Sequence, residues 1–491
     1  MAPRITVHGH FYQPPRENPW TGAVDTQPGA APFHDWNERV HAEAYRPNAH
    51  VVLPGEEPDE RVEVSNFEKL SFNVGPTLLE WMKEADPQTY ESIVHADRAS
   101  AERLGHGNAI AQAYHHTILP LSPVRDIRTQ VRWGLRDFRH RFGRRSRGIW
   151  LPETAADERT IDVLVEEGVE FTILSPVQAR AWSEDGGQWV DVADEPIDTT
   201  VPYRCAHSDG SGRFVTIFFY DGGISHSIAF DGAAASAEGL MDLFEARARP
   251  GACHLVHAAT DGETYGHHHK FGDIGLAYAL YVEAEQRGVE VVNYASFLEE
   301  CPAQRWAHIP AAGTSWSCVH GVGRWREDCG CFTGGEAGWN QKWRGPLRRA
   351  LDVVRQTADE VYERLGREAF EHPWGARDRY VDVVTGAVAV DEFVESEGTG
   401  AAVDRAARLL ELQRSSMSMF TSCGWFFNDL AGIETTQVLL YAARTMDLLE
   451  ELGEAAPVDR FLSILAEAER NDPEAGTGAE IYKRAVAEAK R

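Results

Sequence analysis

Short apolar segments alternate with longer amphipathic segments over the first 300 residues of the chain. Continuous apolar runs are typical of strands buried on both faces, and apolar spacing of three and four is typical of helices. Repetition of this order predicts a parallel sheet covered by helices, such as those at 126–140 and 160–167. The expected strands are residues 5–7, 148–151, 169–174, 214–220, 254–258 and 289–293.

The chain changes character after residue 300. At 491 residues it exceeds the roughly 250 to 300 residues at which one hydrophobic core stops growing. A Trp-, Gly- and Cys-rich segment at 301–345 precedes amphipathic helical patterns. We therefore expect an α/β domain over 1–300, a connecting segment over 301–345 and a helical region over 346–491. Within these, we expect helices at 346–365, 402–419, 435–452 and 458–469, a surface loop at 53–63 and a loose tail from residue 471.

The formal charge of the chain is -28, from 76 acidic and 48 basic residues. This excess argues against nucleic acid or an anionic membrane as the main partner and is compatible with a neutral substrate. The start of the chain lacks the pattern of a secretory signal, and no apolar run reaches the about 18 residues of a membrane span. We expect a soluble, cytoplasmic protein whose seven cysteines are reduced, and make no prediction about its oligomeric state.

Hydrogen-bonding side chains follow several of the expected strands. His8 and His10 follow the first strand, Glu153 the second, Asp221 the fourth and Asp261 the fifth. The carboxyl ends of parallel strands meet at one edge, so these side chains are expected to gather there. The alternative for each acid is that it caps the helix that follows.

Two of these acids lie in motifs that suit cleavage of a glycosidic bond. Trp-Leu-Pro-Glu ends at Glu153, and Asp-Gly-Glu-Thr-Tyr-Gly begins at Asp261. Enzymes that cleave such bonds with retention use two carboxyl groups about 5 to 5.5 Å apart. The two motifs are therefore candidate halves of one site.

These motifs, together with His-Gly-His-Phe-Tyr-Gln-Pro-Pro at 8–15, resemble segments of glycoside hydrolase family 57 in order and spacing. Residues 71–81 are also similar to a family segment. The resemblance implies an α/β fold, an incomplete (β/α)7 barrel followed by a helical C-terminal region. It also implies a retaining hydrolase or transglycosylase that acts on α-glucans. Residues 314–325 and 422–430 resemble a DUF3536-like extension that is found in one branch of the family.

The resemblance assigns Glu153 as the nucleophile and Asp261 as the general acid/base. A nucleophilic carboxylate must stay ionised, whereas the acid needs burial or a nearby negative charge to hold its proton. Glu263 or Asp221 is expected to supply that charge.

Further residues are predicted to bind the substrate. The resemblance places His8, His10 and Gln13 at a sugar subsite, with Trp150 stacked on a ring. The segment at 105–110 lacks a glutamate that the family usually carries, which leaves the substrate preference open. The predicted substrate-binding residues are His8, His10, Gln13, Trp150, Asp221, Glu263, His267, Trp425 and Asp429.

Cys318, His320, Cys329 and Cys331 cluster in the connecting segment. We expect a reduced packing cluster and assign no metal or cofactor, and a tetrahedral zinc site is the alternative. Tryptophans in the same segment could instead form a wall for sugar stacking.

Two other functions are compatible with the sequence. A metal-dependent deacetylase or mannosidase of related barrel shape would use His8, His10 and Asp261 as zinc ligands. A non-catalytic glucan-binding protein would keep the cleft without turnover. The deacetylase or mannosidase function predicts that Glu153 is dispensable. The binding function predicts that no product forms.

Overall fold

The structure, a computed structural model, describes residues 2–55, 57, 59–249, 251, 253–471 and 476–491. The chain divides into two compact units. Unit 1 comprises Met1–Gln13, Thr26–Gln112 and Arg141–Ala311, and unit 2 comprises Pro14–Asp25, Ala113–His140 and Ala312–Arg491. Two segments from the expected first domain, residues 14–25 and 113–140, thus cluster with the C-terminal helices.

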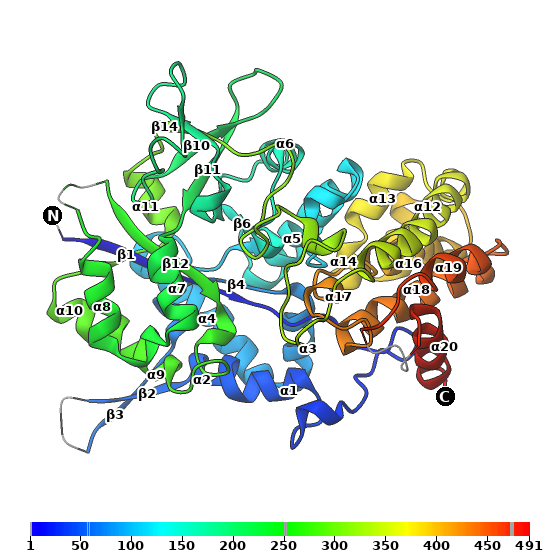
Figure 1. Cartoon of the computed structure of the whole chain (residues 1–491), viewed down its shortest axis with the longest axis horizontal. Coiled ribbons are helices and arrows are strands. Elements are labelled where there is room, and N and C mark those ends of the chain that lie inside the picture. The colour runs from blue at the N-terminus through cyan, green and yellow to red at the C-terminus, as the bar shows by residue number, and fades with distance from the viewer. Residues whose placement is uncertain (1, 56, 58, 250, 252, 472–475) are drawn as a thin grey trace. The chain divides into compact units, whose positions relative to one another are not determined.

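Parallel strands form the centre of unit 1 (Figure 1). Strand β1 pairs with β12, β4 and β13, and β5, β6, β7 and β11 pair in that order. Phe72 of β4 bridges to Ala109 just before β5, and the backbone N–H of Asp221 after β11 donates to His257 of β12. The bounds are β1 Arg4–Phe11, β4 Ser71–Val74, β5 Ala111–Gln112, β6 Gly148–Trp150, β7 Phe171–Leu174, β11 Phe214–Phe219, β12 Leu255–Asp261 and β13 Glu290–Val291.

Each apolar run that predicted a strand contains one. Among the parallel strands, β4 and β5 were not predicted. Strand β1 extends to Phe11, so His8 and His10 lie within it rather than after it. Antiparallel pairing of β10 with β11, and further pairing through β14, β8 and β9, extends the second sheet. These strands span Tyr203–Ala206 (β10), Arg305–His308 (β14), Ala181–Ser183 (β8) and Val190–Asp191 (β9).

The prediction of a surface loop at 53–63 is wrong at its ends. Val51–Pro54 (β2) and Arg61–Val64 (β3) form an antiparallel hairpin, while residues 56 and 58 lie outside the described residues. Val51 and Leu53 are buried and pack with Ala277. The β2 strand thus has a buried apolar face, which the acidic residues of the segment did not indicate.

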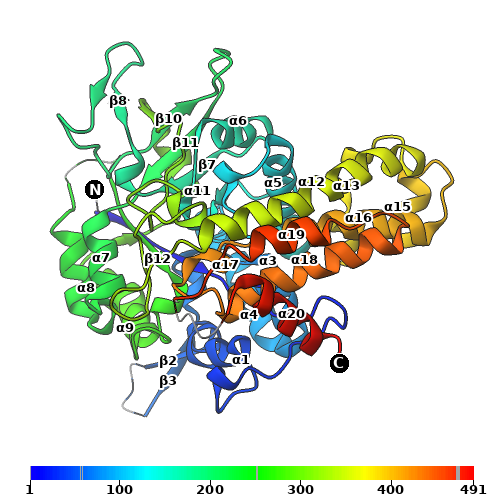
Figure 2. The ribbon, with the colours of Figure 1, turned by 45° about the vertical axis from the view of Figure 1, so that its right-hand side comes forward.

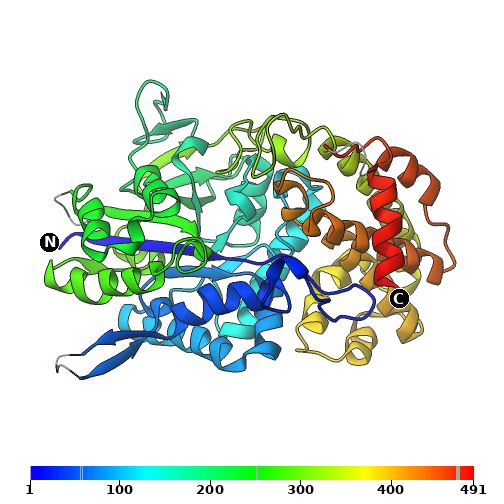
Figure 3. The same cartoon turned by 60° about the horizontal axis from the view of Figure 1, so that its bottom comes forward.

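Helices of unit 1 follow the strands and lie on both sides of β1, the dark blue strand in Figure 3. Asp86, Asp157, Asp221 and Asn293 each accept a backbone N–H as the N-cap of a helix, which fixes where these helices begin. The helices are α1 Trp36–Val40, α2 Arg46–Ala49, α3 Pro76–Ala85, α4 Pro87–Leu104, α6 Glu158–Glu166, α7 Gly222–Phe230, α8 Ala237–Glu245, α9 Gly272–Tyr278, α10 Ala284–Gln286 and α11 Tyr294–Glu300.

Unit 2 is helical, and α12, α16 and α18 contact one another and contribute buried residues to its apolar core. Figure 2 shows the course of these helices. The four expected helices are present as α12, α16, α18 and α19. The helices are α5 Val124–Phe142, α12 Arg344–Ala369, α13 Pro373–Arg379, α14 Val381–Val384, α15 Val390–Glu397, α16 Val403–Ser418, α17 Cys423–Phe426, α18 Ile433–Glu451, α19 Val458–Leu465 and α20 Gly478–Ala489. Among the described residues, none of the helices is both long and apolar enough to cross a membrane.

The prediction of a loose tail from residue 471 is wrong for its described C-terminal part. Thr477 and Glu480 form a capping box that starts α20. Ile481 and Ala485, one helical turn apart, are buried. Residues 472–475 lie outside the described residues.

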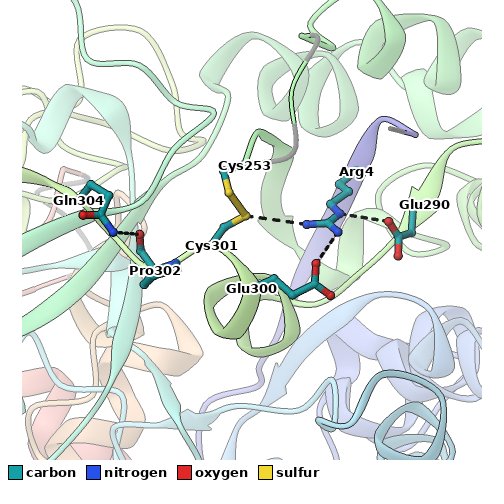
Figure 4. The surroundings of a disulfide bond; sticks show 7 residues. All are labelled: Arg4, Cys253, Glu290, Glu300, Cys301, Pro302 and Gln304. Atoms are coloured by element: carbon teal, nitrogen blue, oxygen red, sulfur yellow. Dashed lines mark hydrogen bonds and ion pairs between the residues drawn. A yellow bond between two sulfur atoms is a disulfide. The ribbon is translucent and has the colours of Figure 1, made fainter.

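A disulfide joins Cys253 to Cys301, which corrects the expectation that all cysteines are reduced (Figure 4). Strands β12 and β13 both pair with β1, and this brings the segment before β12 close to the end of α11, with Cα atoms 5.4 Å apart. Arg4 of β1 pairs with Glu290 and Glu300 beside it. The other five cysteines form no disulfide.

Arg377 ties residues 113–140 to the C-terminal helices of unit 2. Its guanidinium, 1% exposed, donates to Asp126 at 2.8 Å, to Gln413 at 2.9 Å and to Thr129 at 2.6 Å. Its backbone carbonyl accepts from Trp133 Nε1. Burial raises the pKa of Asp126, but the charge of Arg377 opposes it and the net shift is downward. Asp126 is therefore held as a carboxylate by this pair.

We expect Arg377→Met to destabilise unit 2 by about 3 to 5 kcal/mol, because it leaves a buried carboxylate without its main partner. The control is Arg367→Met, whose ion pair with Glu363 lies at the surface and is worth about 0 to 1 kcal/mol. Urea unfolding followed by circular dichroism measures both. Similar small effects for the two variants would contradict this account of unit 2.

Candidate active site

The pairing of β1 with β12 brings the first and last motifs together. His10 is in register with Asp261 across the two parallel strands. Residues Gly262–Thr264 then form a 3-10 turn, so the acidic motif turns away directly after the strand ends. The site is thus assembled at the carboxyl ends of neighbouring strands, as the sequence predicted for these two motifs.

Glu153 lies in a strained turn after β6. Its φ is 57° and that of Thr154 is 50°, in the left-handed region that residues other than glycine rarely adopt. Gln178 holds the turn, because its amide donates to Thr154 O and accepts from Thr154 Oγ1, both at 2.8 Å. The Glu153 side chain is buried, with 9% exposure. Strain that the surroundings enforce in this way is common at functional sites.

Asp261 stands at the tip of β12 and is accessible to solvent, unlike the rest of that strand. Its pKa is raised well above the ordinary value, first by desolvation from the surrounding protein and then by the charges of Glu263 and Glu153. Glu153 and Asp261 therefore interact electrostatically. Of the two acids expected to raise the pKa of Asp261, Glu263 contributes to the shift.

Glu263 is buried between two tyrosines. Its Oε1 accepts from the backbone N–H of Tyr12 at 2.9 Å and from the Tyr45 hydroxyl at 2.6 Å. Burial raises the pKa of Glu263 to about 7, although both hydrogen bonds act in the opposite direction. This carboxyl therefore changes charge near neutral pH, next to Asp261.

His8 and His10 share one face of β1 and both stack on Trp150. The ring centroids are 4.9 Å and 5.0 Å from that of Trp150, with interplanar angles of 16° and 19°. Trp150 is fully buried, so its ring faces these histidines and does not present an open surface to a sugar. It therefore supports the histidines.

Asn73 of β4 orders the two histidines. Its Nδ2 donates to His10 Nδ1 at 2.8 Å and to Gln112 Oε1 at 2.8 Å, and its Oδ1 is 3.1 Å from His8 Nε2. The other His8 nitrogen is 3.1 Å from the Ser71 hydroxyl. Burial lowers the pKa of His8 to about 3, so this ring is neutral and its Nε2–H donates to Asn73. In His10, Nδ1 accepts, which puts the proton of a neutral ring on Nε2.

Sequence reasoning missed Asn73, Gln112 and Tyr45. Asn73 lies inside the family-like segment at 71–81, which was the available signal for it. Gln112 belongs to a strand of two residues, too short for a periodic pattern. Tyr45 reaches Glu263 from a distant part of the chain, and no local pattern predicts that contact.

The other predicted residues of unit 1 have these partners. Gln13 is half-buried, and its side chain donates to Tyr12 O at 3.2 Å. His267 Nδ1 is hydrogen-bonded to Glu43 Oε2. Asp221 caps α7 and pairs with Arg247, which matches the helix-cap alternative for this acid.

Trp425 and Asp429 lie in unit 2. Trp425 is fully buried, donates from Nε1 to Arg344 O and lies 4.1 Å beneath the Arg348 guanidinium. Asp429 accepts two hydrogen bonds from Arg470. These contacts are internal to unit 2, and a substrate role for both residues stays a prediction.

Potential metal ligands converge elsewhere. Among the described residues, groups of at least three such side chains form around Cys318 and around His34, and neither group includes His8, His10 or Asp261. Both nitrogens of His8 are already engaged with Ser71 and Asn73. The ligand set that a metal-dependent deacetylase would need is not assembled by these residues.

Comparison with known proteins gives relatives named as alpha-amylases and 4-alpha-glucanotransferases. A 4-alpha-glucanotransferase of Thermococcus kodakarensis is 24% identical over 31% of this chain and 26% of its own length. The chain spans about a quarter of the length of the curated relatives it matches.

Solved structures share the fold. An exo-type maltose-forming amylase from Pyrococcus sp. ST04 superposes with a TM-score of 0.68 at 17% identity, over 94% of this chain and 82% of that chain. A branching enzyme from Pyrococcus horikoshii gives a TM-score of 0.58 at 16% identity, over 100% and 97% of the two chains. The α/β fold with a helical C-terminal region is thereby confirmed.

Family models match nearly the whole chain and confirm the resemblance seen in the motifs. The model of a domain of unknown function, DUF3536, matches residues 339–491. The model of glycosyl hydrolase family 57 matches residues 12–310, more than half of the chain. The protein therefore belongs to glycosyl hydrolase family 57.

Proposed function

We propose that this protein is a retaining α-glucan hydrolase or glucanotransferase that forms a covalent glycosyl-enzyme on Glu153. The observation that carries the proposal is that Glu153, directly after β6, and Asp261, at the end of β12, lie close enough to interact electrostatically. Desolvation, then the charge of Glu263 and then that of Glu153 raise the pKa of Asp261. An acid that holds its proton beside an ionised carboxylate is the division of labour that retention requires. The names of the relatives, a glucanotransferase and amylases, support an α-glucan substrate.

We propose an incomplete (β/α)7 barrel for the catalytic domain. The succession of parallel pairings from β12 through β1, β4, β5, β6 and β7 to β11 supports it. The proposed order along the chain is a catalytic domain at 1–300, a connecting segment at 301–345 and a helical region at 346–491. The protein is further proposed to be cytoplasmic, with an α-glucan as its partner.

In the first step, a carboxylate oxygen of Glu153 attacks the anomeric carbon and forms a covalent bond to it. The glycosidic C–O bond breaks, and the proton of Asp261 passes to the departing oxygen. In the second step, the Asp261 carboxylate takes a proton from the acceptor hydroxyl, which attacks the same carbon and releases Glu153. Water as acceptor gives hydrolysis, and a glucan hydroxyl gives transfer. Two displacements retain the anomeric configuration.

The surrounding residues prepare these two carboxyls. Glu263 disfavours ionisation of Asp261. Tyr12 and Tyr45 fix the position of Glu263 by hydrogen bonds to its carboxyl group. Asn73 sets the orientation of His8 and His10, and Trp150 packs against both rings. In this proposal His10, Gln13 and His267 orient the sugar, while His8 and Trp150 act by holding His10 in place.

Glu153→Gln is expected to abolish turnover of short and long α-glucans, because an amide cannot form the glycosyl ester. Asp261→Asn is expected to lower kcat by about 10²- to 10⁴-fold, the range for loss of general acid–base catalysis. Glu299→Gln, at an exposed carboxyl, serves as the control and should keep wild-type rates. Chromatography of the released and transferred sugars measures all four proteins.

Other outcomes of that experiment identify the alternatives. Full activity of Glu153→Gln contradicts the proposal. Acetate release from acetylated glycans by the intact protein would indicate a deacetylase. Glucan binding without product by the intact protein would indicate a binding protein.

The value of kcat/KM is expected to fall at high pH, because Asp261 loses the proton that it has to donate. Glu263→Gln removes a negative charge that raises the pKa of Asp261, so this basic limb should move to lower pH, by on the order of one pH unit. The shift is largest above pH 7, where Glu263 itself is ionised. A basic limb unchanged from wild type, with Glu299→Gln as the control, would show that Glu263 does not tune the acid.

A further inference from the structure

Unit 2 contains a compact cluster of thiols and one imidazole in the connecting segment. Cys318, His320, Cys329 and Cys331 each offer one potential ligand atom, and these atoms all lie within 4.8 Å of one another. We propose that the four side chains form a closed, tetrahedral zinc site with a structural role. This inference is independent of the proposed function, because it involves residues of unit 2 and no catalytic group.

The distances in the cluster match the edges of a zinc tetrahedron. With Zn–S bonds of about 2.3 Å and Zn–N bonds of about 2.0 to 2.1 Å, sulfur atoms lie about 3.8 Å apart and sulfur and nitrogen about 3.5 Å apart. Cys318 Sγ is 3.9 Å from Cys329 Sγ, and Cys331 Sγ is 3.5 Å from His320 Nδ1. The two pairs share no atom, so they correspond to opposite edges of one tetrahedron.

Alternative states of the cluster explain these positions less well. A disulfide has its sulfur atoms about 2.05 Å apart, far shorter than the Cys318–Cys329 separation. Three thiols could form one disulfide and would leave one thiol and His320 over. Simple apolar packing of reduced thiols gives no reason for the exposed His320 to turn its Nδ1 toward Cys331.

The backbone is shaped to bring the two ligand pairs together. Gly321, directly after His320, and Gly330, between Cys329 and Cys331, both have left-handed backbones, with φ of 76° and 79°. A Cβ at Gly323 would lie 3.0 Å from the Cβ of Cys329 and 3.4 Å from that of His320. The absence of a side chain at this glycine lets the two ligand-bearing segments approach.

The site would hold a long irregular segment in place. Within residues 312–343, all of them described, the regular element is the 3-10 helix Gly323–Trp325. Arg324 donates to Phe426 O and Trp325 Nε1 donates to Ser422 O, so this segment packs on residues 422–428. A metal cross-link offsets the entropic cost of ordering such a segment.

The ligand set indicates the metal and its role. Three thiolates and one imidazole in tetrahedral arrangement suit Zn²⁺. Four protein ligands leave no open coordination position, which is the property of structural rather than catalytic zinc sites. The cluster is therefore not a second catalytic centre.

The test uses the untagged full-length chain, expressed with added zinc and purified under reducing conditions without chelators. Mass spectrometry of the metal content is expected to give one zinc per chain. Cys318→Ser and Cys331→Ser should each reduce this to about zero, whereas Cys423→Ser, at a cysteine that lies outside the cluster and in no disulfide, should keep it. Less than about a tenth of an equivalent in the intact chain, or full zinc in both cluster variants, overturns the proposal.

A second measurement uses only the intact chain, so it stays informative if the cysteine variants fail to fold. Replacement of the metal by Co²⁺ in the intact chain should give the thiolate charge-transfer band and the intense d–d bands of tetrahedral cobalt. A spectrum of octahedral cobalt without thiolate bands would contradict the site. Zinc removal from the folded intact chain should also lower its unfolding midpoint, with α-glucan activity excluded as a readout; an unchanged midpoint contradicts the structural role.

Discussion

The parallel pairing of β1 with β12 is the constraint on which the site depends. It sets His10 beside Asp261 and delivers the turn that carries Glu263 to Tyr12, at the end of β1. A slip by one residue would turn the alternate side chains of β1 to the opposite face and separate both histidines from Trp150. The chemistry thus depends on strand register before it depends on any single charge.

Charge around Asp261 is arranged at the cost of local stability. Three carboxyls share a small region, and the pKa values of Asp261 and Glu263 are both raised. Glu153 adds a left-handed backbone conformation that Gln178 has to hold. Proteins tolerate such features where function requires them, because a proton must be held on one carboxyl while another stays ionised.

The sequence predicted the strands with uniform apolar runs and the position of two acidic motifs directly after strands, because these are local patterns. It did not predict β4, where Ser71 and Asn73 are polar because they bond the buried His8. It also missed the Cys253–Cys301 disulfide, whose partners are 48 residues apart and meet only through β1. The sequence showed the residue types of a zinc site. The sulfur–sulfur and sulfur–nitrogen distances in the structure are what favour zinc over simple packing.

The most direct test of the account is to trap the covalent intermediate. A glucosyl donor with fluorine at C2 and a good leaving group slows release of the glycosyl-enzyme, so that peptide mass spectrometry can locate the sugar. The account predicts one glucosyl unit on the peptide that contains Glu153. A sugar on a different residue, or first-formed products with inverted anomeric configuration by NMR, would contradict it.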